Sequence, residues 1–159
     1  MSDALQHLQY MVEGHWTVGE RSGVTAEGVE RKIEFAAPVD FNGEAGFWTP
    51  EHFLLAAVAS CFTTTFRAIA GYSKLDVAAL EIRVEGTLTK NSSGWDFTSI
   101  VMRPRLTIHH ESERPRAGRI LEKTEHGCLI ARALKCPVEM YATIDSLSRV
   151  VECETVEVT

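Results

Sequence analysis

The fold of this chain is decided by the stretch from Thr49 to Ser73, which reads TPEHFLLAAVASCFTTTFRAIAGYS. Thr49 is a good N-cap residue, and Pro50 suits the first helical position because its missing N–H would be unpaired there. Glu51 suits the positive end of the helix dipole. Gly71 and the polar pair at 73–74 are typical of a helix end. The sequence therefore predicts one long helix over this stretch.

This predicted helix has an unusually apolar interior. Arg67 is the only strong charge between positions 53 and 70, and apolar residues occur on every side of the helix. Such a pattern predicts a helix that is buried rather than amphipathic. A membrane span of this length is disfavoured, because polar side chains crowd its centre: Ser60, Thr63, Thr64, Thr65 and Arg67.

Length and composition indicate one ordinary globular domain, covering residues 1–159. The chain is 45% hydrophobic and 24% charged, which is typical of a soluble protein with a sizeable core. The net charge of -6 argues against a nucleic-acid partner, because affinity for phosphates depends on clustered Lys and Arg. The first residues lack the pattern of a secretory signal, so we expect a cytoplasmic protein with reduced thiols and no membrane partner.

The rest of the chain alternates between strand and helix patterns. Residues 2–11 suggest a short helix or an arm, and residues 36–48 a loop before the long helix. Strands are predicted over residues 15–21, 29–35, 80–88, 95–110, 138–144 and 150–159, with turns at 22–23 and 91–94. Helical spacing returns over residues 113–135, with a break at His126 and Gly127. These elements predict an α+β protein, in which Pro104 marks an edge or a bulge of its strand.

The four cysteines are Cys61, Cys128, Cys136 and Cys153. None belongs to a C-x-x-C pair, and a zinc site needs a denser set of ligands, so we expect no metal. Cys136 falls at a helix end, where a structural role is the default interpretation.

The sequence pattern alone leaves the role of Cys61 open. A free cysteine in an apolar helix is usually a buried, inert side chain, because burial without a partner raises the thiol pKa. A reactive Cys61 needs a cationic or hydrogen-bonding neighbour, and the hydroxyls of Thr64 and Thr65 are placed to serve. Cys128 is predicted to open the second half of the broken helix, where free N–H groups favour a thiolate.

Two motifs resemble a known family. The string WTPEHFLLAAVASCF is similar to the Asn-Pro-Glu…Ala-Cys-Phe signature of the OsmC and organic hydroperoxide resistance superfamily. The later HGCLIARAL is similar to the second motif of that family, with 67 positions separating Cys61 from Cys128. The resemblance implies an OsmC-like fold, in which antiparallel β-sheets wrap around long central helices and two subunits form an intertwined homodimer.

The resemblance also implies a thiol peroxidase that reduces organic hydroperoxides, and hydrogen peroxide more weakly, in oxidative stress defence. In such an enzyme Cys61 attacks the peroxide and becomes a sulfenic acid, and Cys128 then condenses with it to form a disulfide. An external dithiol of lipoyl or thioredoxin type restores both thiols. No cofactor and no metal are implied.

Glu51 matches the family's glutamate at the helix start, which positions an arginine beside the reactive thiolate. Glu51 and Cys61 lie ten residues apart, about 15 Å along one helix, so they cannot touch within one chain. In the family the second subunit completes the site. Arg21 falls at about the position of the arginine in one branch of the family, with Arg31 as the other candidate.

Two other functions remain open at this point. One is a non-catalytic OsmC-like protein that binds an apolar small molecule. It is favoured because another branch of the family has its arginine in the loop before the helix, where this chain has Asp40 and Phe41 instead. The other is a redox sensor, in which the Cys61–Cys128 disulfide forms without turnover. The preferred hydroperoxide, the physiological reductant and the roles of Cys136 and Cys153 are not indicated by the sequence.

Overall fold

The computed structural model describes residues 7–16, 19 and 21–148. Contacts within the chain divide it into two compact units, residues 1–54 and 55–159. The strand predicted over 150–159 lies outside the described residues, as does Cys153. Residues 7–11 of the expected arm form neither helix nor strand. The expectation of a single domain stays a prediction.

The first unit contains a three-stranded antiparallel sheet in the order β1-β2-β3. Its elements are β1 (Val12–Trp16), β2 (Arg21–Ala26), β3 (Val29–Ala36) and the 3₁₀ helix η1 (Val39–Phe41). The predicted meander is therefore present, but Ser22 and Gly23 lie inside β2 and form no turn. The chain reverses instead at Gly28, whose φ of 75° is accessible to glycine without strain.

Helix α1 (Pro50–Tyr72) begins where the sequence predicts. The Thr49 Oγ1 accepts a hydrogen bond from the His52 N–H at 3.3 Å, and His52 Nδ1 accepts one from the Thr49 N–H at 3.1 Å. This reciprocal pair has the geometry of a capping box, with histidine in place of the usual Glu or Gln. Two of the N–H groups that a helix start leaves unpaired are satisfied in this way.

The end of α1 is set by Lys74 rather than by Gly71. Lys74 has a φ of 52°, in the left-handed region, and its N–H donates to the Gly71 carbonyl at 3.1 Å. The Leu75 N–H donates to the Ala70 carbonyl at 3.0 Å. These two bonds form a Schellman motif, and the buried Leu75 supplies its apolar contact.

One face of α1 is buried, so the prediction of burial on every side is wrong for a single chain. The buried residues recur every four positions: Val58, Phe62, Phe66 and Ala70. Ser60, Thr63, Thr64 and Arg67 are exposed. By length and composition alone α1 could also cross a membrane, with a mean hydropathy of 1.6. Its packing against a sheet, described next, is that of a core helix.

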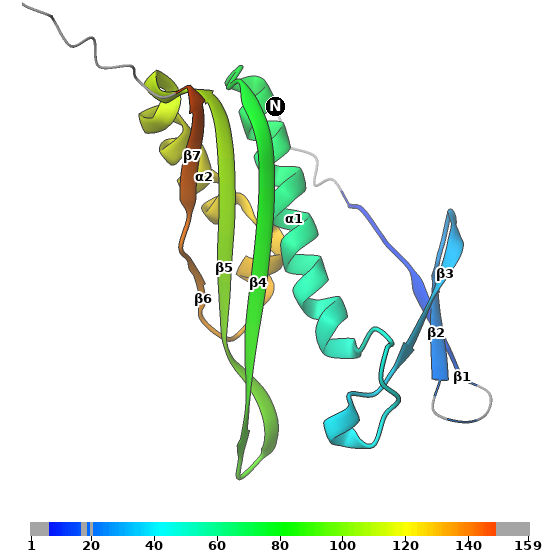
Figure 1. Cartoon of the computed structure of the whole chain (residues 1–159). Coiled ribbons are helices and arrows are strands. Elements are labelled where there is room, and N and C mark those ends of the chain that lie inside the picture. The colour runs from blue at the N-terminus through cyan, green and yellow to red at the C-terminus, as the bar shows by residue number, and fades with distance from the viewer. Residues whose placement is uncertain (1–6, 17–18, 20, 149–159) are drawn as a thin grey trace, which may run out of the picture. The chain divides into compact units, whose positions relative to one another are not determined.

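The second unit is built on a mixed sheet (Figure 1). Its strands are β4 (Val77–Asn91), β5 (Gly94–His110), β6 (Val138–Met140) and β7 (Thr143–Ser148). The long strand β5 pairs with β4 antiparallel, and with both β6 and β7 parallel. The α+β class is confirmed, but the single strand predicted over 138–144 is two strands, and both run parallel to β5.

Pro104 lies in the central strand β5 and not at a bulge, but one side of β5 is unpaired at this position, so the predicted edge is present only locally. It pairs in register with Ile82 of β4. On the other side of β5, β6 ends opposite Met102 and β7 begins opposite Arg105. Pro104 therefore falls between the two parallel partners. A residue without an N–H is tolerated there because no strand faces it on that side.

Two helices follow β5, after the short 3₁₀ helix η2 (Glu111–Glu113): α2 (Arg114–Gly127) and α3 (Leu129–Ala133). The predicted break at His126 and Gly127 is confirmed. Helices α1 and α2 lie on the same side of the β4–β5 ribbon (Figure 1), and their apolar faces share one core with β5. Its buried members are Val58, Phe62, Phe66, Ala70, Leu75, Met102, Leu106, Ile108, Ala117, Ile120, Leu121 and Cys128.

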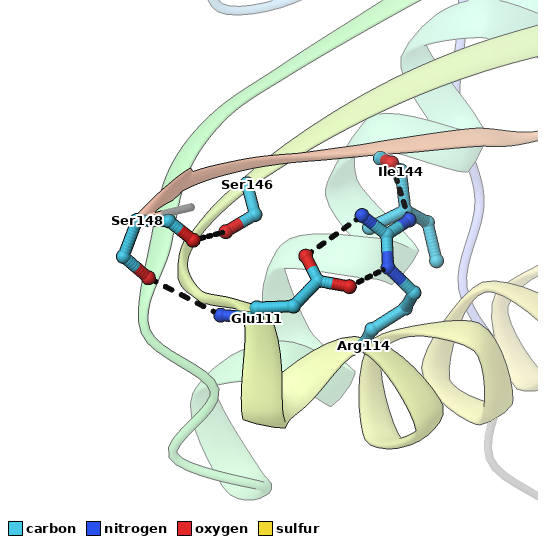
Figure 2. Close-up of polar contacts among 5 residues, drawn as sticks. All are labelled: Glu111, Arg114, Ile144, Ser146 and Ser148. Atoms are coloured by element: carbon cyan, nitrogen blue, oxygen red, sulfur yellow. Dashed lines mark hydrogen bonds and ion pairs between the residues drawn. The ribbon is translucent and has the colours of Figure 1, made fainter. Parts of the chain in front are cut away.

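A polar cluster fastens the start of α2 to β7 (Figure 2). Arg114 makes a bidentate ion pair with the Glu111 carboxylate and donates a hydrogen bond to the Ile144 carbonyl. The Glu111 N–H donates to the Ser148 Oγ at 3.4 Å, and the Ser146 Oγ donates to the Ser148 carbonyl at 2.8 Å. The Arg114 hydrogen bond lowers the pKa of Glu111. The cluster thus holds β7 in place beside β5.

The shared core predicts a sharp contrast between two leucines. Leu106 is 0% exposed and Leu147 is 63% exposed. Leu106→Ala should lower the free energy of unfolding by about 2 to 5 kcal/mol, since it leaves a cavity beneath α1 and α2. Leu147→Ala should change it by less than about 1 kcal/mol. Urea unfolding of both variants measures the difference, and equal losses would contradict this assignment of the core.

Candidate active site

Helix α1 brings Cys61 to the edge of the shared core. Val58 and Phe62, three positions before and one after it in α1, are buried, and their burial fixes the rotation of the helix against the sheet. Cys61 itself is partly buried, packs against the core cluster and is a free thiol. The helix rotation that buries Phe62 therefore places the Cys61 sulfur at the margin of the core, accessible to a small molecule.

The junction of α2 and α3 supplies the second cysteine. The Cys128 N–H donates to the Glu125 carbonyl at 3.3 Å, and the Cys128 carbonyl accepts from the Arg132 N–H at 3.1 Å. Cys128 thus ends α2 and opens α3, and its thiol is 0% exposed. The first N–H groups of α3 have no partner within the helix, so they are free to bind a sulfur.

These two elements bring Cys61 and Cys128 into direct contact. Burial raises the pKa of Cys61, but four hydrogen bonds to its sulfur outweigh burial and lower that pKa overall. The donors are the Ile130 N–H, the Cys128 thiol, the Thr65 hydroxyl and the Leu129 N–H. Hydrogen bonds to a charged form favour it, so Cys61 is the sulfur of the pair that ionises more readily.

Cys128 shows the opposite shift. Burial raises its pKa, and the hydrogen bond that its thiol donates to Cys61, together with the charge on Cys61, raises it further, while the Ala131 and Ile130 N–H groups oppose this rise. The start of α3 therefore does favour a thiolate on Cys128, as expected, but burial and the neighbouring Cys61 outweigh this effect and the pKa is raised overall. The Leu129 and Ile130 N–H groups also bond the Cys61 sulfur, whose pKa is lowered.

Only one of the two threonines proposed from the sequence reaches the sulfur. The Thr64 hydroxyl donates to main-chain carbonyls of its own helix, Ser60 at 2.9 Å and Cys61 at 3.1 Å. The Thr65 hydroxyl bonds the Cys61 sulfur. Thr65 also packs against the end of α2, where a Cβ on Gly127 would come within 3.2 Å of the Thr65 Cγ2. The glycine before Cys128 thus lets α1 and α2 approach closely.

Arg21 and Glu51, the two polar site residues expected from the sequence, both lie in the first unit. Arg21 makes a two-pronged ion pair with Glu44, with both nitrogen to oxygen distances at 2.8 Å, and lies over the Phe47 ring at 4.8 Å. The Glu51 Oε2 is buried and accepts no hydrogen bond from any described residue. Glu51 and Arg21 belong to residues 1–54, whereas both cysteines belong to the second unit.

Two neighbouring histidines and a third cysteine have their own contacts away from the Cys61–Cys128 pair. His109 and His110 lie 3.7 and 3.9 Å from the Asp76 carboxylate. Within residues 7–16, 19 and 21–148, no group of three His, Cys, Asp or Glu side chains could hold a metal ion. Cys136 is a partly buried free thiol, and it lines a cavity together with His126.

The main-chain donors are the part of the site that the sequence did not reveal. The break before Cys128 did predict a helix start, which is the signal for free N–H groups. Which sulfur these groups would face depended on packing between α1 and α3, and no local pattern reports that packing.

Comparison with known proteins identifies relatives of this arrangement. The family profile described as OsmC-like protein matches residues 43–142, which include both cysteines and Glu51. The uncharacterized protein YmaD of Bacillus subtilis (strain 168) is 25% identical over 135 residues, covering 82% of this chain and 89% of that protein.

Solved structures share the fold. An OsmC-like protein of unknown function from Vibrio cholerae has a TM-score of 0.78 at 19% identity, covering 86% of this chain and 100% of that one. A protein from Legionella pneumophila named as the organic hydroperoxide resistance protein OsmC gives 0.70 at 20% identity, covering 89% and 99%. The organic hydroperoxide resistance protein OhrB of Bacillus subtilis gives 0.62 at 17% identity, covering 87% and 98%. With a profile match over well more than half its length, this chain belongs to the OsmC-like protein family.

Proposed function

We propose that this protein is a cysteine-based peroxidase that reduces organic hydroperoxides to alcohols. The observation that carries the proposal is the contact between Cys61 and Cys128 with opposite pKa shifts. A two-cysteine peroxidase needs a readily ionised thiol that attacks the peroxide and a second thiol that then resolves the sulfenic acid, and this pair could supply both. Three neighbours in fold are named as organic hydroperoxide resistance proteins, which supports the same substrate class.

The proposed reaction has two steps on the protein. The Cys61 thiolate attacks the outer oxygen of R–O–O–H, the O–O bond breaks, and RO⁻ leaves and takes up a proton as the alcohol. Cys61 is then a sulfenic acid. The Cys128 sulfur attacks it, an S–S bond forms, and the hydroxyl leaves with the Cys128 proton as water. An external dithiol of lipoyl or thioredoxin type reduces this disulfide by exchange and is itself oxidised.

The apolar margin of the site supports an organic substrate over hydrogen peroxide. Cys61 packs against the same core cluster as Val58 and Phe62, so an alkyl or aryl group on the peroxide would meet apolar side chains. Burial of that group adds binding energy of roughly 25 cal/mol per Å² of apolar surface. Hydrogen peroxide cannot gain this contribution.

We further propose that the working form is an intertwined homodimer, in which the second subunit supplies Glu51 and an arginine to each site. A buried carboxylate oxygen without a partner is costly, and the Glu51 Oε2 is such an atom in the single chain. Large apolar side chains are also exposed on the first sheet, with Val12 at 64% and Trp16 at 68%. A partner chain that covers these surfaces would account for both features.

The free thiols Cys61, Cys128 and Cys136 suit a cytoplasmic location, where cysteines stay reduced. One observation favours the non-catalytic alternative, a protein that binds an apolar small molecule. Arg21 is already paired with Glu44, so its charge is partly neutralised before any substrate binds.

The three experiments below separate the peroxidase from the non-catalytic binding protein, and steady turnover also separates the enzyme from a redox sensor.

The first prediction concerns turnover of cumene hydroperoxide with a dithiol reductant. Cys61→Ser should reduce consumption to the uncatalysed rate, because the nucleophile is lost. Cys128→Ser should consume about one equivalent per subunit in a burst and then slow, since the sulfenic acid lacks its internal thiol. Cys136→Ser is the matched control and should turn over as wild type does. Slow wild-type consumption, unchanged by any of these substitutions, would favour the binding protein.

The second prediction concerns the pH dependence of Cys61 alkylation by iodoacetamide. The thiolate is the reactive form, and the pKa of Cys61 is lowered, so its alkylation should persist to lower pH than that of an unfolded chain. Thr65→Val should shift the profile to higher pH and slow alkylation at pH 7 roughly tenfold, as expected for a lost hydrogen bond to an ionised group.

Thr64→Val provides the matched control, because the Thr64 hydroxyl bonds only carbonyls of its own helix. Its profile should coincide with that of the wild type. Equal shifts in the two variants would show that the effect comes from helix packing and not from the bond to sulfur.

The third prediction separates the two arginines. If Arg21 serves the site, Arg21→Met should lower kcat/KM for cumene hydroperoxide roughly 100-fold, the cost of removing one aligned cation or donor. Arg31→Met should stay within about twofold of wild type, as a surface substitution does. The reverse order would assign the role to Arg31, and two unaffected variants would remove arginine from the proposed mechanism.

A further inference from the structure

A second group of reactive side chains lines a cavity on the side of the second unit formed by α2, α3, β5 and β6. The cavity has a volume of ≈ 430 Å³, which is within the range of small-molecule sites. Met102 and Val138 give it an apolar part. Its polar part comes from Glu125, His126, Arg132 and Cys136. None of these groups takes part in the chemistry proposed for Cys61.

The Glu125 carboxylate and the Arg132 guanidinium of this cavity make no ion pair with other described residues. Some arginines of the second unit are paired, as Arg105 is with Asp145 at 2.7 Å and Arg114 is with Glu111. Within the part of the chain that the structure describes, neither the Glu125 carboxylate nor the Arg132 guanidinium makes a hydrogen bond or an ion pair. One cavity thus presents a free anion and a free cation beside a free thiol.

His126 lines the same cavity, and a main-chain contact holds its ring. Its Nδ1 lies 2.7 Å from the Glu122 carbonyl oxygen. A carbonyl can only accept, so Nδ1 carries the hydrogen of the neutral ring. The Nε2 of that ring is then left with a lone pair. His126 thus adds a polar group to the lining of the cavity that contains Cys136.

We propose that this cavity is a site of S-thiolation, at which Cys136 forms a mixed disulfide with a small thiol of amino-acid type. Such a thiol carries a carboxylate, which Arg132 binds, and an ammonium, which Glu125 binds. The complementary charges select zwitterions over ligands of one sign, since each single-sign ligand would leave one group facing a like charge. The site is independent of the peroxidase proposed above.

The reaction is a thiol–disulfide exchange. The Cys136 thiol loses its proton to solvent, and the resulting thiolate attacks one sulfur of the small disulfide R–S–S–R. That S–S bond breaks as the new one forms, and the second half leaves as RS⁻ and takes up the proton. Cys136 and one R–S group are joined as a disulfide, and the other R–S group is reduced to the free thiol.

Four disulfides with matched reactive centres test this site: cystine, cystamine, dithiodipropionate and bis(2-hydroxyethyl) disulfide. Trypsin cuts after Lys135 and Arg149, so Cys136 is recovered apart from the other cysteines and its adducts are measured by mass spectrometry. The rate at Cys136 in the folded protein is divided by the rate in the urea-unfolded chain, which removes intrinsic differences among the reagents. Cystine should exceed the other three by roughly fivefold or more, the effect of two partly exposed ion pairs.

Charge-neutralising variants identify the selecting groups. Arg132→Gln and Glu125→Gln should each lower the preference for cystine to roughly twofold or less. Two matched controls lie on α2 outside the cavity: Lys123→Gln removes a positive charge, as Arg132→Gln does, and Glu122→Gln removes a negative charge, as Glu125→Gln does. Both should keep the wild-type preference. The proposal is overturned if all four reagents give the same folded-to-unfolded ratio, or if the control pair changes the preference as much as the cavity pair. Both readouts hold whether or not Cys61 reduces peroxides.

Discussion

The hydrogen bonds from the first turn of α3 to the Cys61 sulfur are the interaction on which the site depends. Burial raises the pKa of Cys61, and these main-chain bonds, together with those from the Cys128 thiol and the Thr65 hydroxyl, reverse the shift. With them, the Leu129 and Ile130 N–H groups find a partner outside their helix. One arrangement thus satisfies N–H groups at the start of α3 and favours the ionised form of the Cys61 sulfur of α1.

This interaction depends in turn on the packing of α1 against the sheet. Val58, Phe62, Phe66 and Ala70 recur every four residues and rest on the core formed with β5 and α2. Their burial fixes the rotation of α1 and hence the direction of Cys61. Gly127 lets the end of α2 approach Thr65, which brings Cys128 and the start of α3 to the same place. Core packing and thiol chemistry are therefore two consequences of one contact between helices.

Much of this arrangement could be predicted from local patterns. The Thr49–Pro50 start of α1, the ribbon of β4 and β5, and the helix break before Cys128 each follow from capping, alternation or glycine signals. The errors have a common origin in tertiary context. Local sequence does not show that Pro104 would face a gap between β6 and β7, or that the N–H groups of α3 would lower the pKa of Cys61 while that of Cys128 is raised overall.

The exposed side of α1 also shows that local sequence cannot report tertiary or quaternary contacts. Its composition predicted burial all round, yet Ser60, Thr63, Thr64 and Arg67 are exposed in the single chain. Composition reports how much surface a helix needs to cover, but it does not say which chain covers it. The unpaired Glu51 Oε2 and the exposed Trp16 are the corresponding signals in the first unit.

The most direct test of the account is peptide mapping after one equivalent of cumene hydroperoxide is added to the fully reduced protein. The account predicts one dominant product, an intramolecular disulfide between Cys61 and Cys128, with Cys136 still a free thiol. In Cys128→Ser a sulfenic acid at Cys61, trapped with dimedone, should replace it. A protein whose Cys61 stays reduced while peroxide is consumed, or whose Cys61 pairs with another cysteine, would contradict the assignment of attacking and resolving thiols.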